Sequence, residues 1–224
     1  RVAAQPRSRV ARLNADGTLD PGFVMNLSTA PATVAVLANG QILLGGSIGV
    51  TTSGVTRAYL LRLEASGAVD ASFDPRLDTS VSAIGVQTDG RIVIGGLFTS
   101  VGGVPRRYLA RLNADGTLDA GFNSQAGLDN SVSTVNVLAD GRSLIGGQFS
   151  TFNGAARPGL VRLAADGIVD PTLAPAIVLS GVASVLVQGD GRIVVGGSFS
   201  SVNGIARRDL ARLNADGTLD TTWA

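Results

Sequence analysis

Arginine and aspartate recur at a fixed spacing and are the side chains of this sequence best suited to chemistry. In every copy of the string RLNADGTLD, or of a close variant, an Arg stands eight residues before an Asp. The pairs are Arg12/Asp20, Arg62/Asp70, Arg111/Asp119, Arg162/Asp170 and Arg212/Asp220. A turn closed by Asn14 and Thr18 sets Arg opposite Asp across a hairpin, where opposite charges stabilise a sheet. Because a ligand site seldom recurs identically in every repeat, we predict that these pairs are structural and not a ring of charged ligands.

The same string also offers oxygen atoms to a metal ion. Asn14, Asp16 and Asp20 have a spacing found in parts of calcium-binding loops. Calcium needs six to eight oxygen ligands at about 2.5 Å, and the string lacks the terminal bidentate Glu of such loops. Turn formation alone explains Asn, Asp and Gly at these positions. We therefore predict no cofactor, with calcium as the alternative.

A second set of arginines recurs five residues before each Arg of the pairs. Its members are Arg7, Arg57, Arg106, Arg157 and Arg207. A ring of guanidinium groups could bind carboxylates or sulfated sugars through paired hydrogen bonds. The interpretation that we favour is that each caps carbonyl groups of the neighbouring repeat, again because the residue recurs in every repeat.

The composition excludes several classes of function. The chain has 224 residues, of which 45% are hydrophobic and 16% charged, and its net charge is +1. This balance favours a packed globular protein over disorder and offers no basic excess for a nucleic-acid partner. The sequence contains no Cys and no His, which excludes disulfides, the usual zinc sites and His-dependent nucleophilic catalysis. No apolar run reaches spanning length, so we predict no membrane insertion.

The charged positions belong to an internal repeat of about 50 residues. A turn pair, a short apolar strand and Gly-Gly form a second motif, which reads DGRIVIGG at 89–96 and alternates with the first along the chain. Asp89-Gly90 predicts a two-residue type I′ turn between strands A and B. The string at 111–119 predicts a type I turn with a G1 bulge between strands C and D, with Gly116 left-handed. Nothing in the sequence has sustained helical periodicity.

Four short antiparallel strands per repeat predict an all-β fold, a β-propeller built from four-stranded blades. Such a sheet cannot bury both faces alone, whereas neighbouring blades can cover each other. We expect the Gly-Gly pair to permit a sharp bend or a close approach between backbones.

The phase of the repeats suggests where the array is cut. We predict a single array over 1–224, with a C–D half-blade at 1–23 and repeats at about 24–73, 74–122, 123–173 and 174–224. Five C–D hairpins against four A–B hairpins favour an excerpt of a longer array. The surplus terminal half-blade could instead mediate self-association, because an unpaired strand edge invites strand addition.

The combination of RLNADGTLD, DGRIVIGG and a following LARLN resembles the bacterial delta-60 repeat, a β-propeller-type array. The Gly-Gly doublet and the closing aromatic residue are similar to kelch repeats, although Leu173 replaces the aromatic in one copy and Ile48 replaces a Phe in another. The resemblance covers essentially the whole chain. It implies a secreted or cell-surface bacterial repeat protein, and therefore an extracellular location.

Variable connections between uniform hairpins are where we expect a ligand to bind, since binding residues concentrate on loops carried by a rigid scaffold. These are the B–C and D–A loops, with the candidate residues Arg76, Asp78, Gln125, Asp129, Asn130 and Asn153. We predict a non-enzymatic structural or binding module that presents these loops to a protein or glycan partner. The alternative is a carbohydrate-active enzyme on a propeller scaffold that uses loop Asp residues, for which Asp74, Asp78 and Asp129 remain.

Overall fold

A computed structural model describes residues 7, 9–52, 55–122, 127–173 and 177–223. Across these residues the chain is all-β, with antiparallel strands and without a helix. None of the described segments is a helix long and apolar enough to cross a membrane. The prediction of an all-β fold is confirmed.

Four sheets follow one another along the chain. The first contains β1 (Thr33–Val36), β2 (Ile42–Thr52) and β3 (Val55–Leu63). The second contains β4 (Val81–Val86), β5 (Ile92–Gly96) and β8 (Leu109–Leu112). The third contains β9 (Val132–Val137), β10 (Ser143–Gly147) and β13 (Leu160–Leu163). The fourth contains β14 (Ile177–Val187), β15 (Ile193–Val202), β16 (Ile205–Ala206) and β17 (Leu210–Leu213).

The segment predicted as strand D does not form a regular strand. In each described repeat it forms one isolated bridge to strand C, such as Leu112 to Leu118 and Leu13 to Leu19. The first three sheets therefore have three regular strands and not the four of the predicted blade, and in the fourth sheet the additional strand is β16 and not strand D. The physical reason is the Asp that follows the bridge: Asp119 accepts a hydrogen bond from the Gly121 backbone N–H at 3.0 Å, which turns the chain away from the sheet.

The turns between strands A and B differ from the prediction. The Gln87 N–H donates to the Arg91 carbonyl at 2.8 Å and the Gly90 N–H to the Gln87 carbonyl at 2.9 Å, with Gly90 at φ +83°. Asp89 stays at negative φ, because its carboxylate accepts from the Arg91 N–H at 3.0 Å. This is a type I turn with a G1 bulge and not the predicted type I′ turn, which needs positive φ at both central residues. The C–D turns have the predicted bulged form, with Gly116 at φ +92°.

Short additional hairpins occupy the B–C connections, in place of the predicted loops. They are β6 (Ser100–Val101) with β7 (Val104–Pro105), and β11 (Thr151–Phe152) with β12 (Ala155–Ala156). In the fourth sheet the corresponding strand β16 pairs with the end of β15. Asn153 and Gly154, at φ +49° and +80°, both have the positive φ of a type I′ turn. The signal was present, because Asn-Gly between short strands is the preferred pair for this turn.

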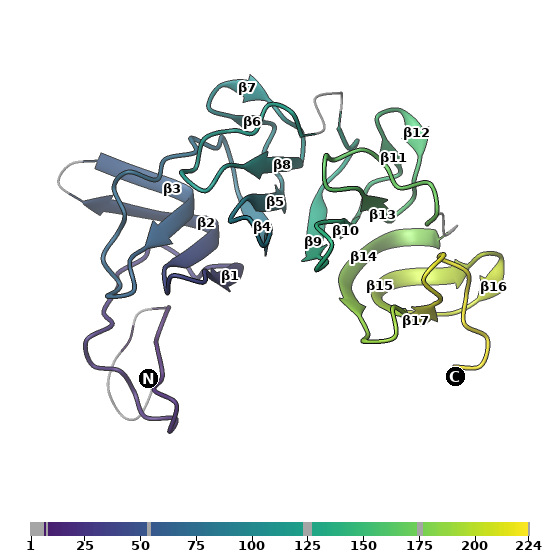
Figure 1. Ribbon diagram of the computed structural model, residues 1–224, viewed down its shortest axis with the longest axis horizontal. Coiled ribbons are helices and arrows are strands. Elements are labelled where there is room, and N and C mark those ends of the chain that lie inside the picture. The colour runs from purple at the N-terminus through teal and green to yellow at the C-terminus, as the bar shows by residue number, and fades with distance from the viewer. Residues whose placement is uncertain (1–6, 8, 53–54, 123–126, 174–176, 224) are drawn as a thin grey trace.

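The sheets cover one another in sequence order. Figure 1 shows them along an open arc, with β1, β4 and β9 toward its inside, the small hairpins toward its outside, and a gap between the purple and yellow ends. Strand β4 packs on β1 and β2, β9 on β4 and β5, and β14 on β9 and β10. Each apolar cluster therefore spans two consecutive repeats. Leu43 and Leu60 of the first sheet, for example, pack with Val81 and Ile94 of the second.

The Gly-Gly pair makes these close approaches possible, as predicted. A Cβ atom on Gly95 would lie 2.2 Å from Cγ1 of Val132 in the third sheet. A Cβ atom on Gly96 would lie 2.2 Å from the Ser80 carbonyl oxygen of its own sheet. Neither distance leaves room for a side chain. Gly95 therefore allows the third sheet to pack closely on the second, and Gly96 allows the chain at Ser80 to approach β5.

Candidate functional site

The five Arg–Asp pairs lie across their hairpins as predicted. In each pair a guanidinium nitrogen of the strand-C arginine lies close to a carboxylate oxygen of the Asp. The distance is 2.7 Å in Arg12–Asp20 and Arg62–Asp70, 2.8 Å in Arg111–Asp119 and Arg162–Asp170, and 2.9 Å in Arg212–Asp220. The pairs in the middle of the array are the most enclosed, with the Arg111 side chain 5% exposed and that of Asp119 17% exposed. Their geometry supports the structural interpretation.

A second contact of the strand-C arginines joins neighbouring repeats. Arg162 donates through Nη1 to the Ala215 carbonyl in the C–D turn of the next repeat, at 2.9 Å. Arg12 donates likewise to the Ala65 carbonyl, Arg62 to that of Ala114 and Arg111 to that of Ala165. Each of these four guanidinium groups therefore neutralises the Asp of its own repeat and caps a turn of the following one.

An aromatic ring completes most of these clusters. The guanidinium carbon lies 4.5 Å from the ring centroid in Arg62–Phe73 and in Arg111–Phe122, within range of a cation–π contact. The repeat that carries the third sheet has Leu173 at this position, and there Arg162 donates instead to the Thr172 hydroxyl at 2.7 Å. These aromatic side chains therefore pack on the arginines of their own repeats.

The Asp residues of the pairs are held in the charged form. Burial raises the pKa of Asp119, but hydrogen bonds from Arg111 and the Gly121 N–H, with the Arg charges nearby, outweigh it and lower the pKa below its ordinary value of 3.8. Burial also raises the pKa of Asp170. Hydrogen bonds from Thr172, Arg142 and Arg162 outweigh this effect, so the net pKa of Asp170 is far below its ordinary value. These carboxylates are acceptors and not proton donors at neutral pH.

This charge state predicts an acid-sensitive fold. A carboxyl group whose pKa is lower in the folded than in the unfolded chain stabilises the fold above its unfolded pKa and loses that contribution as the pH falls. We therefore expect the free energy of unfolding to fall as the pH decreases below the ordinary Asp value of 3.8. Denaturant titrations at a series of pH values would measure it. Stability that is unchanged throughout this acidic range would contradict the expectation.

The second set of arginines has different partners from those predicted. Arg57 donates through Nη2 to the Ala71 carbonyl at 3.0 Å, and Arg106 to that of Ala120 at 3.5 Å. Both carbonyls lie fourteen residues later in the same repeat, so the expected capping of the neighbouring repeat is wrong for this set. The strand-C arginines cap the neighbour instead, because their position in the sheet faces the next turn.

The oxygen atoms considered for calcium are engaged within the turn. Asp16 accepts from the Thr18 N–H at 2.9 Å and from its hydroxyl at 2.6 Å, and Asn14 donates to the same hydroxyl. Asp20 is bound to Arg12. No group of three or more acidic side chains within metal-binding reach occurs among the described residues.

The variable loops meet at one end of the strands, and two of the predicted residues tie them together. Asp78, in the D–A loop, accepts from the Thr99 N–H at 2.9 Å and the Ser100 N–H at 3.2 Å in the B–C segment. Asp129 accepts from the Ser150 and Thr151 N–H groups at 2.8 and 3.0 Å. Both residues are therefore braces between two loops. We name the D–A segments 74–80 and 127–131, with the B–C segments 97–106 and 148–157, the loop surface.

Asp78 should stabilise the loop surface measurably. We expect Asp78→Ala to lower the free energy of unfolding by about 1–2 kcal/mol, because the Thr99 and Ser100 N–H groups and the Thr99 hydroxyl lose a charged acceptor. Asp74→Ala is the matched control: Asp74 pairs at 3.3 Å with Arg76, whose side chain is 77% exposed, and only at 3.8 Å with Arg57, and its loss should cost under about 1 kcal/mol. Denaturant unfolding and amide exchange at Thr99 and Ser100 would measure both. Equal effects of the two substitutions would contradict the bracing role.

The other predicted site residues are less closely associated. Arg76 is mostly exposed and lies at φ +51°. Asn130 accepts from the neighbouring Ser131 N–H at 2.8 Å. Asn153 occupies the type I′ turn and accepts from the Gly127 N–H at 2.8 Å, so it is a turn residue that also braces the D–A loop. Gln125 lies outside the described residues.

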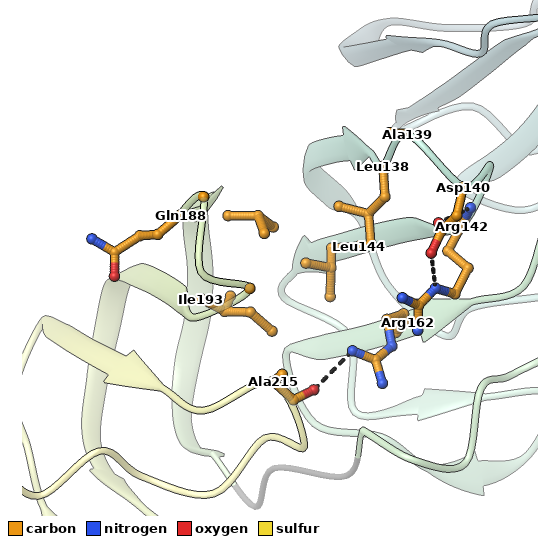
Figure 2. Close-up of a pocket in the computed structure, with 12 residues that line it drawn as sticks. Leu138, Ala139, Asp140, Arg142, Leu144, Arg162, Gln188, Ile193 and Ala215 are labelled. Carbon is orange, nitrogen blue, oxygen red and sulfur yellow. Dashed lines mark hydrogen bonds and ion pairs between the residues drawn. The ribbon is translucent and has the colours of Figure 1, made fainter.

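Two hollows of the described chain lie away from the loop surface, in grooves between consecutive sheets beside the A–B turns. Figure 2 shows the one between the third and fourth sheets, of about 340 Å³, where Arg142 pairs with Asp140 and Arg162 reaches Ala215. Leu138 and Ile193 line its apolar part. An equivalent groove of about 390 Å³ lies between the first and second sheets, lined by residues that include Leu37 and Arg62.

A glutamine spans the intervening junction and was missed from sequence. Gln87 is buried, donates through Nε2 to the Gly141 carbonyl of the third sheet at 2.9 Å and accepts from Arg111 at 3.3 Å. Leu37 and Leu138 occupy the same repeat position as Gln87. Aligning the repeats would have revealed this polar residue at an apolar position.

The comparisons with known proteins agree with the repeat. The profile of a family described as "Domain of unknown function (DUF5122) beta-propeller" matches residues 1–23, 37–73, 87–122, 138–173 and 188–222. No curated protein matches the chain. The chain is similar to a crystal structure of a protein of unknown function from Bacteroides caccae, with 14% identity, a TM-score of 0.40 and coverage of 98% of this chain and 90% of that one. A TM-score of 0.40 does not establish that the two proteins share a fold.

Proposed function

The chain belongs to the DUF5122 beta-propeller family, and from this premise we propose that it is a non-enzymatic structural or binding module. In this proposal the loop surface faces a protein or glycan partner on a secreted or surface-exposed bacterial repeat protein. The extracellular location rests on the resemblance to delta-60 repeats. The matched segments omit 74–86 and 123–137, which contain the D–A loops, so the D–A part of the loop surface lies outside the family profile, whereas its B–C part lies inside it.

The bracing of the loops is the observation that carries the proposal. A binding surface gains affinity when its loops are ordered before the partner arrives, because less conformational entropy is lost on association. Asp78 and Asp129 hold the D–A loops against the B–C hairpins through backbone N–H groups. The loops are therefore variable in sequence and yet fixed in position.

The tips of the B–C segments supply contact area. Val55, Val104 and Ile205 are 50%, 43% and 43% exposed, although they are large apolar residues, and they stand at equivalent positions of three repeats. An Arg follows two residues later in each case. Apolar side chains beside arginines are a common composition for a protein or glycan contact.

The carbohydrate-active enzyme is the weaker candidate for a physical reason. A glycosidase needs a general acid with a raised pKa. Burial raises the pKa of Asp78, but hydrogen bonds from Thr99 and Ser100 outweigh it and lower the pKa, and Asp129 has its pKa lowered in the same way through Ser150 and Thr151. Both loop carboxylates are suited to holding backbone and not to donating a proton.

Binding to a glycan array and to immobilised bacterial surface extract would test the proposal. We expect Val104→Asp and Ile205→Asp on the B–C tips, and Arg76→Ala on the loop surface, to weaken binding at least tenfold. Ile168→Asp, at a residue 66% exposed in a C–D turn, is the control and should leave binding unchanged. Binding that none of the three loop substitutions alters would contradict the proposal, and glycan turnover without stable binding would favour the enzyme.

A further inference from the structure

The junction between the second and third sheets contains a carboxamide group that bridges the two sheets. The Gln87 side chain that carries it belongs to a residue 6% exposed. Its Nε2 atom donates to the Gly141 carbonyl of the third sheet at 2.9 Å. Its Oε1 atom accepts from Nη1 of Arg111, in the second sheet, at 3.3 Å. One primary amide on an apolar stem therefore satisfies a carbonyl of one sheet and a guanidinium group of the other.

Leucine replaces this glutamine at the junctions on either side. Leu37 lines the groove between the first and second sheets, and Leu138 lines the groove between the third and fourth. Both leucines are only partly buried. A leucine side chain ends one bond short of the nitrogen and oxygen atoms of a glutamine. The places of those two atoms are therefore left to the grooves, which have volumes of about 390 and 340 Å³.

The guanidinium group that would bind such an amide is present in both grooves. Arg62 and Arg162 have side chains that are 11% and 7% exposed. Each donates through Nη1 to one carbonyl of the next repeat. At the middle junction, Nη1 of Arg111 serves both such a carbonyl and Gln87. Among the described residues, none accepts a second hydrogen bond from Nη1 of Arg62 or Arg162.

The carbonyl acceptor is present as well. Gly90 and Gly191 line the two grooves and hold the repeat position of Gly141. All three glycines close the same bulged turn, with φ of +83°, +84° and +84° and matching hydrogen bonds from their N–H groups. No described residue donates to the carbonyl of Gly90 or Gly191. Each groove thus has a donor and an acceptor that Gln87 would join in the middle junction.

The remaining lining of the grooves is apolar. Figure 2 shows Leu138 and Arg162 on one wall of the groove between the third and fourth sheets, with Ile193 and Ala215 on the other. A binding site of this kind combines an apolar lining with a few polar groups that orient the ligand. The apolar walls suit the methylene groups of a glutamine side chain, and the two polar groups suit its amide.

We propose that each groove binds the side-chain carboxamide of a glutamine residue from a peptide partner. The amide nitrogen donates to the carbonyl of Gly90 or Gly191, and the amide oxygen accepts from Arg62 or Arg162. The contacts repeat those of Gln87, in which the chain supplies the amide itself. The grooves lie beside the A–B turns, so this site is independent of the partner proposed for the loop surface.

An NMR titration of the full chain with the peptide acetyl-Gly-Gln-Gly-N-methylamide would test the proposal. We expect the backbone N–H signals of Gly90 and Gly191 to shift in a saturable way. The signal of Gly141 should stay unchanged, because Gln87 already fills its junction. The same peptide with Met in place of Gln is the control, since methionine has a similar length without the amide donor. It should bind roughly tenfold more weakly or worse, because both hydrogen bonds are lost.

Substitutions at the repeat position of Gln87 should close or open the site. Leu37→Gln should abolish the response of Gly90 and keep that of Gly191, because the new side chain supplies the amide from within. Leu138→Gln should do the reverse, and Gln87→Leu should make Gly141 respond to the peptide. Each variant introduces a residue that the chain already has at this repeat position. Circular dichroism with thermal unfolding would confirm that the variants fold, and the two leucine variants suffice if Gln87→Leu does not.

Three results would overturn the proposal. The first is a titration in which the glutamine peptide shifts neither Gly90 nor Gly191. The second is a methionine peptide that binds as tightly as the glutamine peptide. The third is a pair of variants, Leu37→Gln and Leu138→Gln, in which both responses persist. N-acetylglucosamine that shifts the same signals with equal affinity would also overturn the assignment to a primary amide.

Discussion

Arg111→Ala should lower the free energy of unfolding by about 3–5 kcal/mol, because it leaves a partly buried carboxylate without its counterion. Arg111 is 5% exposed and binds Asp119 at 2.8 Å. It also stacks on Phe122 and caps the Ala165 carbonyl of the next repeat. One substitution therefore removes an ion pair, a cation–π contact and a link between repeats.

Arg12→Ala is the matched control, since Arg12 makes the equivalent ion pair, ring contact and carbonyl cap with its side chain 36% exposed; Arg111 additionally donates to Gln87. We expect it to cost about 1 kcal/mol or less, because solvent screens an exposed pair. Denaturant unfolding of both variants would measure the difference. An Arg111→Ala variant as stable as Arg12→Ala would show that burial does not strengthen the dependence on the pair.

Gly95→Ala should destabilise the fold by about 1–3 kcal/mol, the usual cost of overpacking a well-packed interior. The added Cβ would lie 2.2 Å from Cγ1 and 2.8 Å from Cβ of Val132, so the third sheet has to move. A clash with a β-branched residue in a strand has little freedom to relax, because its side chain is stiff at χ1.

Gly196→Ala isolates the contribution of the neighbouring sheet. Gly196 stands at the same repeat position, but the atoms nearest its Cβ lie at 3.8 and 3.9 Å and belong to its own sheet. We expect a neutral effect or a gain of about 0.5–1 kcal/mol, because Ala costs less entropy than Gly in a strand. Unfolding measured at low protein concentration would compare the two. Similar destabilisation by both substitutions would contradict the packing of consecutive sheets through this glycine.

Much of the fold could be predicted from the sequence because the same turn and strand motifs recur in each repeat. Gly116 and its equivalents fixed the bulged C–D turns, and the spacing of Arg111 and Asp119 placed them opposite each other. Among the described residues, each C–D turn is closed by one bridge, such as Leu112 to Leu118. Local turn chemistry and cross-strand pairing act over a few residues, so they can be read directly from a string.

The predictions that were wrong concern features that depend on contacts with surrounding groups. Asp89-Gly90 fits two turn types, and the Asp89 hydrogen bond to the Arg91 N–H selects the bulged one. Strand D ends after one bridge because Asp119 turns the chain. For the second set of arginines, the sequence indicated carbonyl capping but could not tell which repeat supplies the carbonyl to Arg57.

The candidate site was predictable as a region and less so as a set of residues. The D–A and B–C loops do meet. However, the carboxylates of Asp78 and Asp129, which were predicted to bind a ligand, accept hydrogen bonds from backbone N–H groups. The role of Gln87 depends on a carbonyl that is 54 residues away. No local pattern encodes a contact at that separation.

A disulfide between consecutive sheets would test the central claim, that each repeat forms a sheet that covers the next. The chain has no cysteine, and a Cβ on Gly85 would lie 3.6 Å from that of Val137, within the range of about 3.5–4.5 Å that a disulfide requires. We predict that Gly85→Cys/Val137→Cys oxidises readily to an intramolecular disulfide, detected by loss of free thiols in the monomer, whereas Leu186→Cys/Val137→Cys does not. Two thiols that stay free in the first variant under mild oxidation would contradict the arrangement of the sheets.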